Sequence, residues 1–284
     1  MIGNLLSNLW SRDDPYALFP GRRKWPAALD DVAKAPPDAP AIRLVSGAQG
    51  IEKLPSYRNL KALWCFDVNE SKLEAICGCI SLESLYIENL KTGALDSLGK
   101  LTNLRVLGVE SCSKVTSLAA FGNFQSLSGL AITHFKNVHD LEPLSSLRSL
   151  RAIAVAGSMW TRMNVDTLKP LAPLGNLELL HLTNMKATDE SLRPLAELQR
   201  LKQLDIANFY PMREFAWLSQ RLRATQCSWF QPFIEMKNSW CKKCKKGTMV
   251  ILTGSRKPMV CNRCGRKALE EHVREWNELT QQAA

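Results

Sequence analysis

The chain has 284 residues, of which 45% are hydrophobic and 23% are charged, and this composition excludes a largely disordered protein. No apolar stretch approaches the roughly 18 residues of a membrane span, and the N-terminus lacks the basic region of a secretory signal, so we expect a cytoplasmic protein without a membrane partner. The net charge of +10 resides in residues 237–267, which hold ten basic and no acidic side chains and therefore predict a separate module.

Residues 1–38 form an irregular segment rich in proline, tryptophan and phenylalanine, and they precede a series of repeats. The first unit of a repeat array exposes its apolar core unless another segment covers it. We therefore expect residues 1–38 to be an N-terminal cap.

An apolar stripe of the form L-x-x-L-x-L occurs eight times between residues 39 and 222. Successive copies follow one another at steps of 21, 22, 22, 23, 23, 27 and 24 residues. A period in this range is typical of stacked supersecondary units, because one unit cannot bury its stripe alone. The copies are centred on Ile42, Leu63, Leu85, Leu107, Leu130, Ile153, Leu180 and Leu204.

Residues 82–103 show the unit most fully. Leu85 and Ile87 lie two positions apart, which predicts a strand that points both side chains to one face. Leucines at every third position follow, as a short helix or 3-10 turn over the same core requires. These are Leu95, Leu98 and Leu101.

This pattern resembles the leucine-rich repeat family, with short units like those of bacterial internalins. The resemblance implies an α/β fold over residues 39–222: a solenoid with a curved parallel β-sheet of about eight strands and short helical or 3-10 segments on its convex side. The longer step after Ile153 predicts a small insertion near residues 159–164. The family favours Asn at the ninth position, and the turns must be satisfied otherwise here, because that position holds Val68, Leu90, Cys112, Phe135, Ser158, Met185 and Phe209.

The resemblance also implies that the concave side of the sheet binds a protein. The outward strand positions are aromatic near the N-terminal end and small in the middle, and exposed aromatic side chains are typical interface anchors. A second interpretation stays open, in which the aromatic side chains pack under residues 1–38. The expected partner-binding residues are Trp64, Phe66, Tyr86, Glu88, Glu110, Thr133, His181 and Asp205.

The sequence contains no G-x-S-x-G, H-E-x-x-H or phosphate-binding glycine motif, so we expect neither an enzyme nor a small-molecule substrate. His134 and His181 have no metal or catalytic pattern around them, and we expect both at the surface. Cys65, Cys79 and Cys112 occupy core positions of their repeats, where buried structural cysteine is expected.

Two C-x-x-C pairs, Cys241 with Cys244 and Cys261 with Cys264, are separated by sixteen residues. Two residues between thiols let both reach one ion, and two such turns complete a tetrahedron. With a strand predicted at 248–252 and its return at 259–260, residues 237–284 resemble a zinc ribbon. We expect a structural Zn²⁺, because four thiolates leave no open coordination position, with an iron centre or a redox pair as the alternatives.

Apolar residues at helical spacing predict a helix over 267–281, and residues 223–236 are expected to be a linker or C-cap. The positive charges of the ribbon are open to three interpretations: nucleic-acid phosphates, an acidic protein, or solvation alone. The predicted basic patch consists of Lys242, Lys243, Lys245, Lys246, Arg256, Lys257, Arg263, Arg266 and Lys267.

These features together predict a non-enzymatic protein–protein interaction scaffold that holds a protein partner against its concave face. One version is an inhibitor or immunity protein for a bacterial toxin or effector, a hypothesis that rests on architecture alone. The alternative is a nucleic-acid-associated regulator that uses the basic ribbon.

Overall fold

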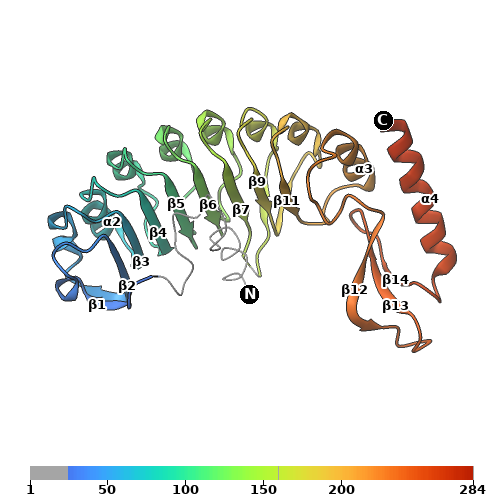
Figure 1. Cartoon of the computed structure of the whole chain (residues 1–284), viewed down its shortest axis with the longest axis horizontal. Helices are drawn as coiled ribbons and strands as arrows, with labels where there is room; N and C mark the ends of the chain where they lie inside the picture. Colours follow the sequence, from blue (N-terminus) through green and yellow to red (C-terminus); the bar gives the residue numbers. More distant parts are fainter. Residues whose placement is uncertain (1–24, 159, 284) are drawn as a thin grey trace.

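The computed structural model describes residues 25–158 and 160–283. Within these residues, nine parallel strands form one sheet in chain order, and Figure 1 shows them side by side along an arc. The predicted leucine-rich repeat solenoid is therefore confirmed. The strands are β1 (Leu29–Asp31), β2 (Ala41–Gln49), β3 (Ala62–Val68), β4 (Ser84–Leu90), β5 (Val106–Glu110), β6 (Gly129–Thr133), β7 (Ala152–Ala156), β9 (Leu179–Leu182) and β11 (Gln203–Ile206).

The register of the sheet follows the repeat exactly as the leucine spacing predicts. Ile42 of β2 pairs with Leu63 of β3, which pairs with Leu85 of β4, and the series continues without a slip to Leu180 and Leu204. Each of these side chains is at most 1% exposed, so the same position of every repeat supplies the core. The added strand β1 lies in the segment expected to be a cap.

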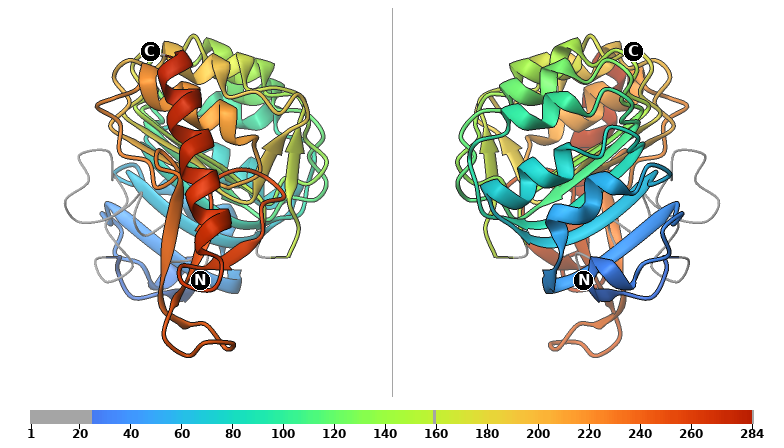
Figure 2. Two further views of the ribbon diagram at one scale, coloured as in Figure 1. Left: turned by 90° about the vertical axis from the view of Figure 1, so that its right-hand side faces the viewer. Right: turned by 90° about the vertical axis from the view of Figure 1, so that its left-hand side faces the viewer.

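The convex side of the solenoid carries short helices, as Figures 1 and 2 show. The apolar residues at three-residue spacing place at least one buried side chain in each 3-10 segment, for example Leu98 and Leu144. The 3-10 segments are η1 (Val32–Lys34), η2 (Ile51–Ser56), η3 (Asp96–Lys100), η4 (Ala119–Asn123), η5 (Glu142–Ser146), η6 (Lys169–Leu171) and η7 (Arg193–Glu197). One repeat instead has the α-helix α2 (Glu70–Cys77), where the Asn69 side chain accepts a hydrogen bond from the Lys72 amide at 3.0 Å.

The structure of the turns after the strands shows how they form without the asparagine that the family favours at the ninth position. The ninth-position residues Val68, Leu90 and Phe135 are buried in the core, and the residue before each has a positive φ, as at Asp67 (53°) and Asn89 (64°). Asn and Asp tolerate this left-handed conformation better than most residues. At the ninth position of another repeat, the Cys112 thiol donates a hydrogen bond to the Thr92 carbonyl oxygen at 3.4 Å.

The longer step in the repeat corresponds to a loop and a second, small sheet. The strand β8 (Met163–Val165) pairs in parallel with β10 (Met185–Ala187), and the Ser158 hydroxyl accepts a bond from the Thr161 amide at 2.8 Å. Trp160 in this loop is 87% exposed. The predicted insertion is thus an ordered loop, although Met159 lies outside the described residues.

The C-terminal module packs against the end of the arc, as Figures 1 and 2 show. After the helix α3 (Met212–Arg221) come three antiparallel strands, β12 (Phe233–Trp240), β13 (Thr248–Leu252) and β14 (Met259–Cys261), and the helix α4 (Arg266–Ala283). The strand β12 begins inside the segment expected to be a linker. In the described part of the chain, no helix is both long and apolar enough to cross a bilayer.

Candidate metal centre and concave face

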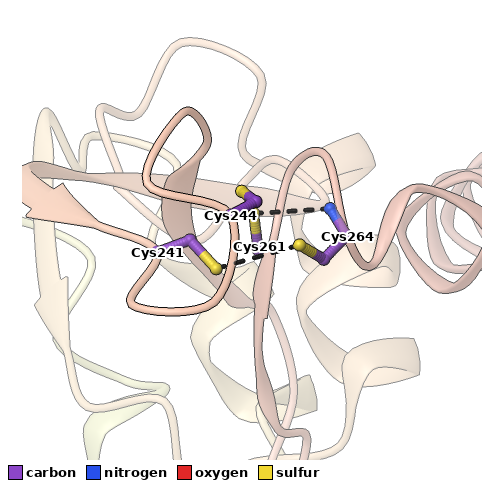
Figure 3. A group of neighbouring side chains, drawn as sticks. All are labelled: Cys241, Cys244, Cys261 and Cys264. Atoms are coloured by element: carbon purple, nitrogen blue, oxygen red, sulfur yellow. Dashed lines mark hydrogen bonds between the residues drawn. The ribbon is translucent and has the colours of Figure 1, made fainter.

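The four cysteines of the two C-x-x-C pairs meet at the tip of the antiparallel sheet, as Figure 3 shows. Cys241 follows β12, Cys244 lies in the turn after it, Cys261 ends β14 and Cys264 precedes α4. Their sulfur atoms all lie within 4.8 Å of one another. Gly247 permits this close approach, because a Cβ atom there would lie 2.5 Å from the Cys261 sulfur.

The sulfur spacing fits a tetrahedral metal ion. The Cys241 and Cys264 sulfurs are 3.9 Å apart, and the Cys244 and Cys261 sulfurs are 3.7 Å apart. Metal–sulfur bonds of about 2.3 Å in a tetrahedron require sulfur–sulfur distances of roughly 3.8 Å. The cluster can therefore bind a metal ion with four thiolate ligands.

Backbone amides near the cluster favour the negatively charged thiolate form of two of the cysteines. The amides of Lys246 and Gly247 lower the pKa of Cys244 to about 6, and the amide of Cys244 lowers that of Cys241. The neighbouring Cys244 sulfur, by contrast, raises the pKa of Cys264 to about 12. A divalent cation bound by the four sulfurs would favour the thiolate form of each cysteine.

Asn208 joins the metal module to the last repeat. Its side-chain amide donates to the Leu252 carbonyl at 2.9 Å and accepts from the Gly254 amide at 2.7 Å. The Ser255 amide also donates to the Tyr210 carbonyl at 2.8 Å. Gly254 is required at this contact, since its φ is +113° and a Cβ atom would lie 3.0 Å from Met212.

Helix α4 provides a second attachment to the arc. Trp276 is 5% exposed and belongs to the same apolar cluster as the repeats, while the Arg221 guanidinium of α3 donates to the Ala283 carbonyl at 2.9 Å. His272 hydrogen-bonds the Pro232 carbonyl oxygen at 2.9 Å, and burial lowers its pKa. The segment 223–232 packs as well, because Trp229 donates to the Ile206 carbonyl at 2.8 Å. The ribbon is consequently fixed on the solenoid end.

The side chains of the basic patch all point into solvent. Two of them make ion pairs, Lys257 with Glu275 at 3.4 Å and Arg266 with Glu270 at 2.7 Å. Trp240 directly precedes the first C-x-x-C pair and is 64% exposed. The exposed basic residues are Lys237, Lys242, Lys243, Lys245, Lys246, Arg256, Lys257, Arg263, Arg266 and Lys267.

The aromatic side chains at the N-terminal end of the concave face pack against one another. The Trp64 ring contacts Tyr86 edge to face at 5.0 Å between centroids, Phe66 stacks on Trp64 at 6.0 Å, and Trp25 contacts Trp64 edge to face at 5.5 Å. The Tyr86 hydroxyl donates to Glu110 at 2.6 Å. Trp25 belongs to the segment 1–38, so one residue of that segment contacts the aromatic end of the concave face, and residues 1–24 lie outside the described part.

The predicted partner-binding residues divide into two groups by exposure. Phe66, Glu88, Glu110 and Asp205 are half-buried, whereas Trp64, Tyr86, Thr133 and His181 are buried. The expectation that His181 is a surface histidine is wrong: its side chain is 4% exposed, and its Nδ1 lies 2.9 Å from the Asp205 carboxylate. Burial is the largest single influence on the Asp205 carboxyl and raises its pKa, but the contacts with His181 and Gln203 together outweigh burial and lower the pKa below its usual value.

Comparison with known proteins shows the fold. An internalin (inlF) from Listeria monocytogenes superposes with a TM-score of 0.52 at 21% identity, over 65% of this chain and 52% of that one. Internalin C2 of the same species gives 0.45 at 18% identity, over 54% of this chain and 66% of that one. Protein SUPPRESSOR OF npr1-1, CONSTITUTIVE 1 from Arabidopsis thaliana is 27% identical over 210 residues, which make up 64% of this chain.

The relatives are longer than the matched region. The chain spans 14% of the length of the plant protein and about half of the first internalin chain. No family model matches the chain. The superposition on the inlF internalin supports the leucine-rich repeat fold.

Proposed function

We propose that this protein is a non-enzymatic scaffold that binds a protein partner on the concave face of its sheet. The observation that supports this most is the pattern of outward side chains. In the middle of the sheet, on β5, β6 and β7, the outward residues include Gly108, Ala131 and Ala154, and the last outward positions of β4 and β5 carry Glu88 and Glu110. Small residues permit close approach, and carboxylates at the rim favour a basic partner surface.

The partner that we infer is a toxin or another effector that the scaffold occludes. Inhibition of this kind needs only a large complementary surface, and an arc of nine strands provides one without any catalytic group. In this proposal the cysteine cluster holds a structural Zn²⁺, which stabilises the ribbon and takes no part in chemistry, because its four ligands are all thiolates.

The test is co-expression with the product of the neighbouring gene, followed by size-exclusion chromatography and a binding titration. We expect a stable complex that Glu110→Lys combined with Asp205→Lys weakens at least tenfold, since each introduces a like charge opposite a basic partner. Glu197→Lys, an exposed change on the convex segment η7, serves as the matched control and should leave affinity unchanged. Equal weakening by the control, or no complex at all, would contradict the proposal.

A second candidate function is binding of nucleic acid by the ribbon. The observation that favours it is a set of exposed basic side chains on the ribbon, two of which, Arg263 and Arg266, line a pocket of about 580 Å³ together with Asn262, Leu269 and Glu270. Phosphate contacts make binding steeply salt-dependent. Retention on DNA or RNA that falls with salt, and that Lys242→Glu with Lys246→Glu abolishes, would support this function. Absence of retention at low salt would exclude it.

A further inference from the structure

The three-stranded sheet of the ribbon has one buried face and one open face. Successive side chains of a strand point to opposite faces, and in β13 Val250 is fully buried whereas its neighbours Met249 and Ile251 are half-buried. Val260 of β14 pairs with Val250 and shares its face. Helix α4 begins against this face, because a Cβ atom at Gly265 would lie 3.1 Å from the Val260 Cβ. The helix lies along one side of the sheet and leaves the face of Met249 and Ile251 open (Figures 1 and 2).

The open face is apolar across all three strands. Ile234 of β12 pairs with Ile251 of β13, which pairs with Met259 of β14, so these three side chains lie side by side. Met249 is two positions from Ile251 and points the same way. Met259 is 55% exposed, and none of the four belongs to or packs against the apolar clusters of the arc. These four residues, which we call the open ribbon face, form the kind of apolar patch that marks an interaction site.

The module that carries the open ribbon face is strongly basic. Residues 237–267 hold ten lysine and arginine side chains and no aspartate or glutamate. Among the described residues, Lys257 pairs with Glu275 and Arg266 pairs with Glu270, and no ion pair involves the other eight. So many like charges on one small module favour an acidic partner, because each carboxylate that approaches offsets part of their mutual repulsion.

The chemistry of the open ribbon face favours a protein over a nucleic acid. Non-specific binding of single strands relies on aromatic rings on which the bases stack, and this face consists of isoleucine and methionine. Trp240 pairs with Thr248, the residue before Met249, and therefore lies on the opposite face. Methionine side chains adapt their shape to the apolar side chains of a protein partner.

The dimensions of the open ribbon face match a single helix. Three strands at ~4.8 Å each give a width of about 14 Å, and the five residues of β13 give a length of about 17 Å. An α-helix with its side chains is about 10–12 Å across, and three turns of it are about 16 Å long. A helix is also the element that most commonly covers the apolar face of a small sheet.

We propose that the open ribbon face binds an acidic amphipathic helix of a protein partner. The apolar side of that helix packs on Ile234, Met249, Ile251 and Met259, and its carboxylates pair with the lysine and arginine side chains of the ribbon. This surface is separate from the concave face of the arc, and the inference does not depend on the partner proposed there.

The test uses the full chain loaded with Zn²⁺ and a fluorescein-labelled peptide, with fluorescence anisotropy as the readout. The peptide is a helix of about 18 residues, or five turns, with leucines on one side and glutamates on the other. We expect saturable binding that Met259→Glu weakens at least about tenfold, because a charge replaces an apolar contact and repels the glutamates. Lys237→Glu with Lys243→Glu should also weaken binding and reduce its dependence on salt.

Each variant has a matched control on the arc. Ile80→Glu changes an apolar side chain that is 65% exposed, and Lys53→Glu with Arg58→Glu reverses two exposed charges. Both controls should leave the affinity unchanged. The zinc content of every variant is measured as well, and Met259→Ser replaces Met259→Glu if the latter does not retain the ion.

Three outcomes would overturn the proposal. One is absence of peptide binding, or binding that Met259→Glu weakens no more than Ile80→Glu does. Another is tighter binding of a labelled oligonucleotide of equal charge with the same sensitivity to Met259→Glu, which would assign the face to nucleic acid. The third is self-association of the unaltered chain that Met259→Glu abolishes, because a second copy of the chain would then cover the face.

Discussion

At the scale of single residues, side chains from three successive repeats join at the C-terminal ends of the strands. The Asp67 carboxylate accepts hydrogen bonds from the Ser46 hydroxyl and, at 2.5 Å, from the Asn89 amide, and it pairs with the Lys91 ammonium at 2.7 Å. Asp67 and Asn89 both adopt the left-handed conformation. The cluster therefore links β2, β3 and β4 at the turns, where the family's usual asparagine is missing.

This cluster predicts a pH dependence. The hydrogen bonds from Lys91 and Ser46 lower the pKa of Asp67 to about 2, below the value near 3.9 of an unfolded aspartate. Ionised Asp67 therefore adds stability that is complete above about pH 4 and is lost as the pH falls through 2. We expect Asp67→Asn to lower the free energy of unfolding by about 1 kcal/mol at pH 6 and by almost nothing at pH 2.

The measurement is denaturant unfolding of both proteins across this range. Glu52→Gln, an exposed change on η2, provides the reference for the other carboxylates. If the free energy of unfolding still differs between the Asp67→Asn variant and the unaltered chain at pH 2, the stability of the turn cluster does not depend on the charge of Asp67.

At the scale of elements, the regular parts could be predicted and the irregular parts could not. The strand register follows from leucines that recur in phase, and the strand at Thr248–Leu252 follows from two flanking cysteine pairs. The strand β12 was missed because its half-exposed residues show no clear alternation and it belongs to no repeat. The burial of His181 and Thr133 could not be predicted either, since it is a tertiary feature that the pattern of a single strand does not encode.

We expect the folding of the ribbon to depend on a metal ion bound by its four cysteines. The ribbon has few buried apolar side chains of its own, chiefly Val250 and Leu252, so ligation must supply much of its folding free energy. We expect one zinc ion per chain, and we expect a chelator to increase amide exchange throughout residues 240–265 while β5–β7 stay protected. Cys261→Ser should reproduce both effects.

The matched control is Cys227→Ser, which changes a half-buried cysteine outside the cluster and should retain the metal. Elemental analysis and hydrogen exchange measure the two effects separately. Unchanged protection of residues 240–265 after complete removal of the metal would refute a structural role for the site.

At the scale of the whole molecule, the repeats and the ribbon act as one body. Asn208, Trp229 and Trp276 attach the C-terminal module to the last repeat through hydrogen bonds and apolar packing. The basic side chains of the ribbon therefore lie at one end of an arc, and the concave side of that arc carries carboxylates. A partner that contacts both surfaces would have to present basic and acidic regions at a fixed separation.

The most direct test of this architecture is small-angle X-ray scattering from the zinc-loaded full chain at several concentrations. We predict a profile that fits a single curved particle with the ribbon docked against α3 and α4. A profile that requires a compact sphere, or an ensemble in which the ribbon separates from the arc, would contradict the account.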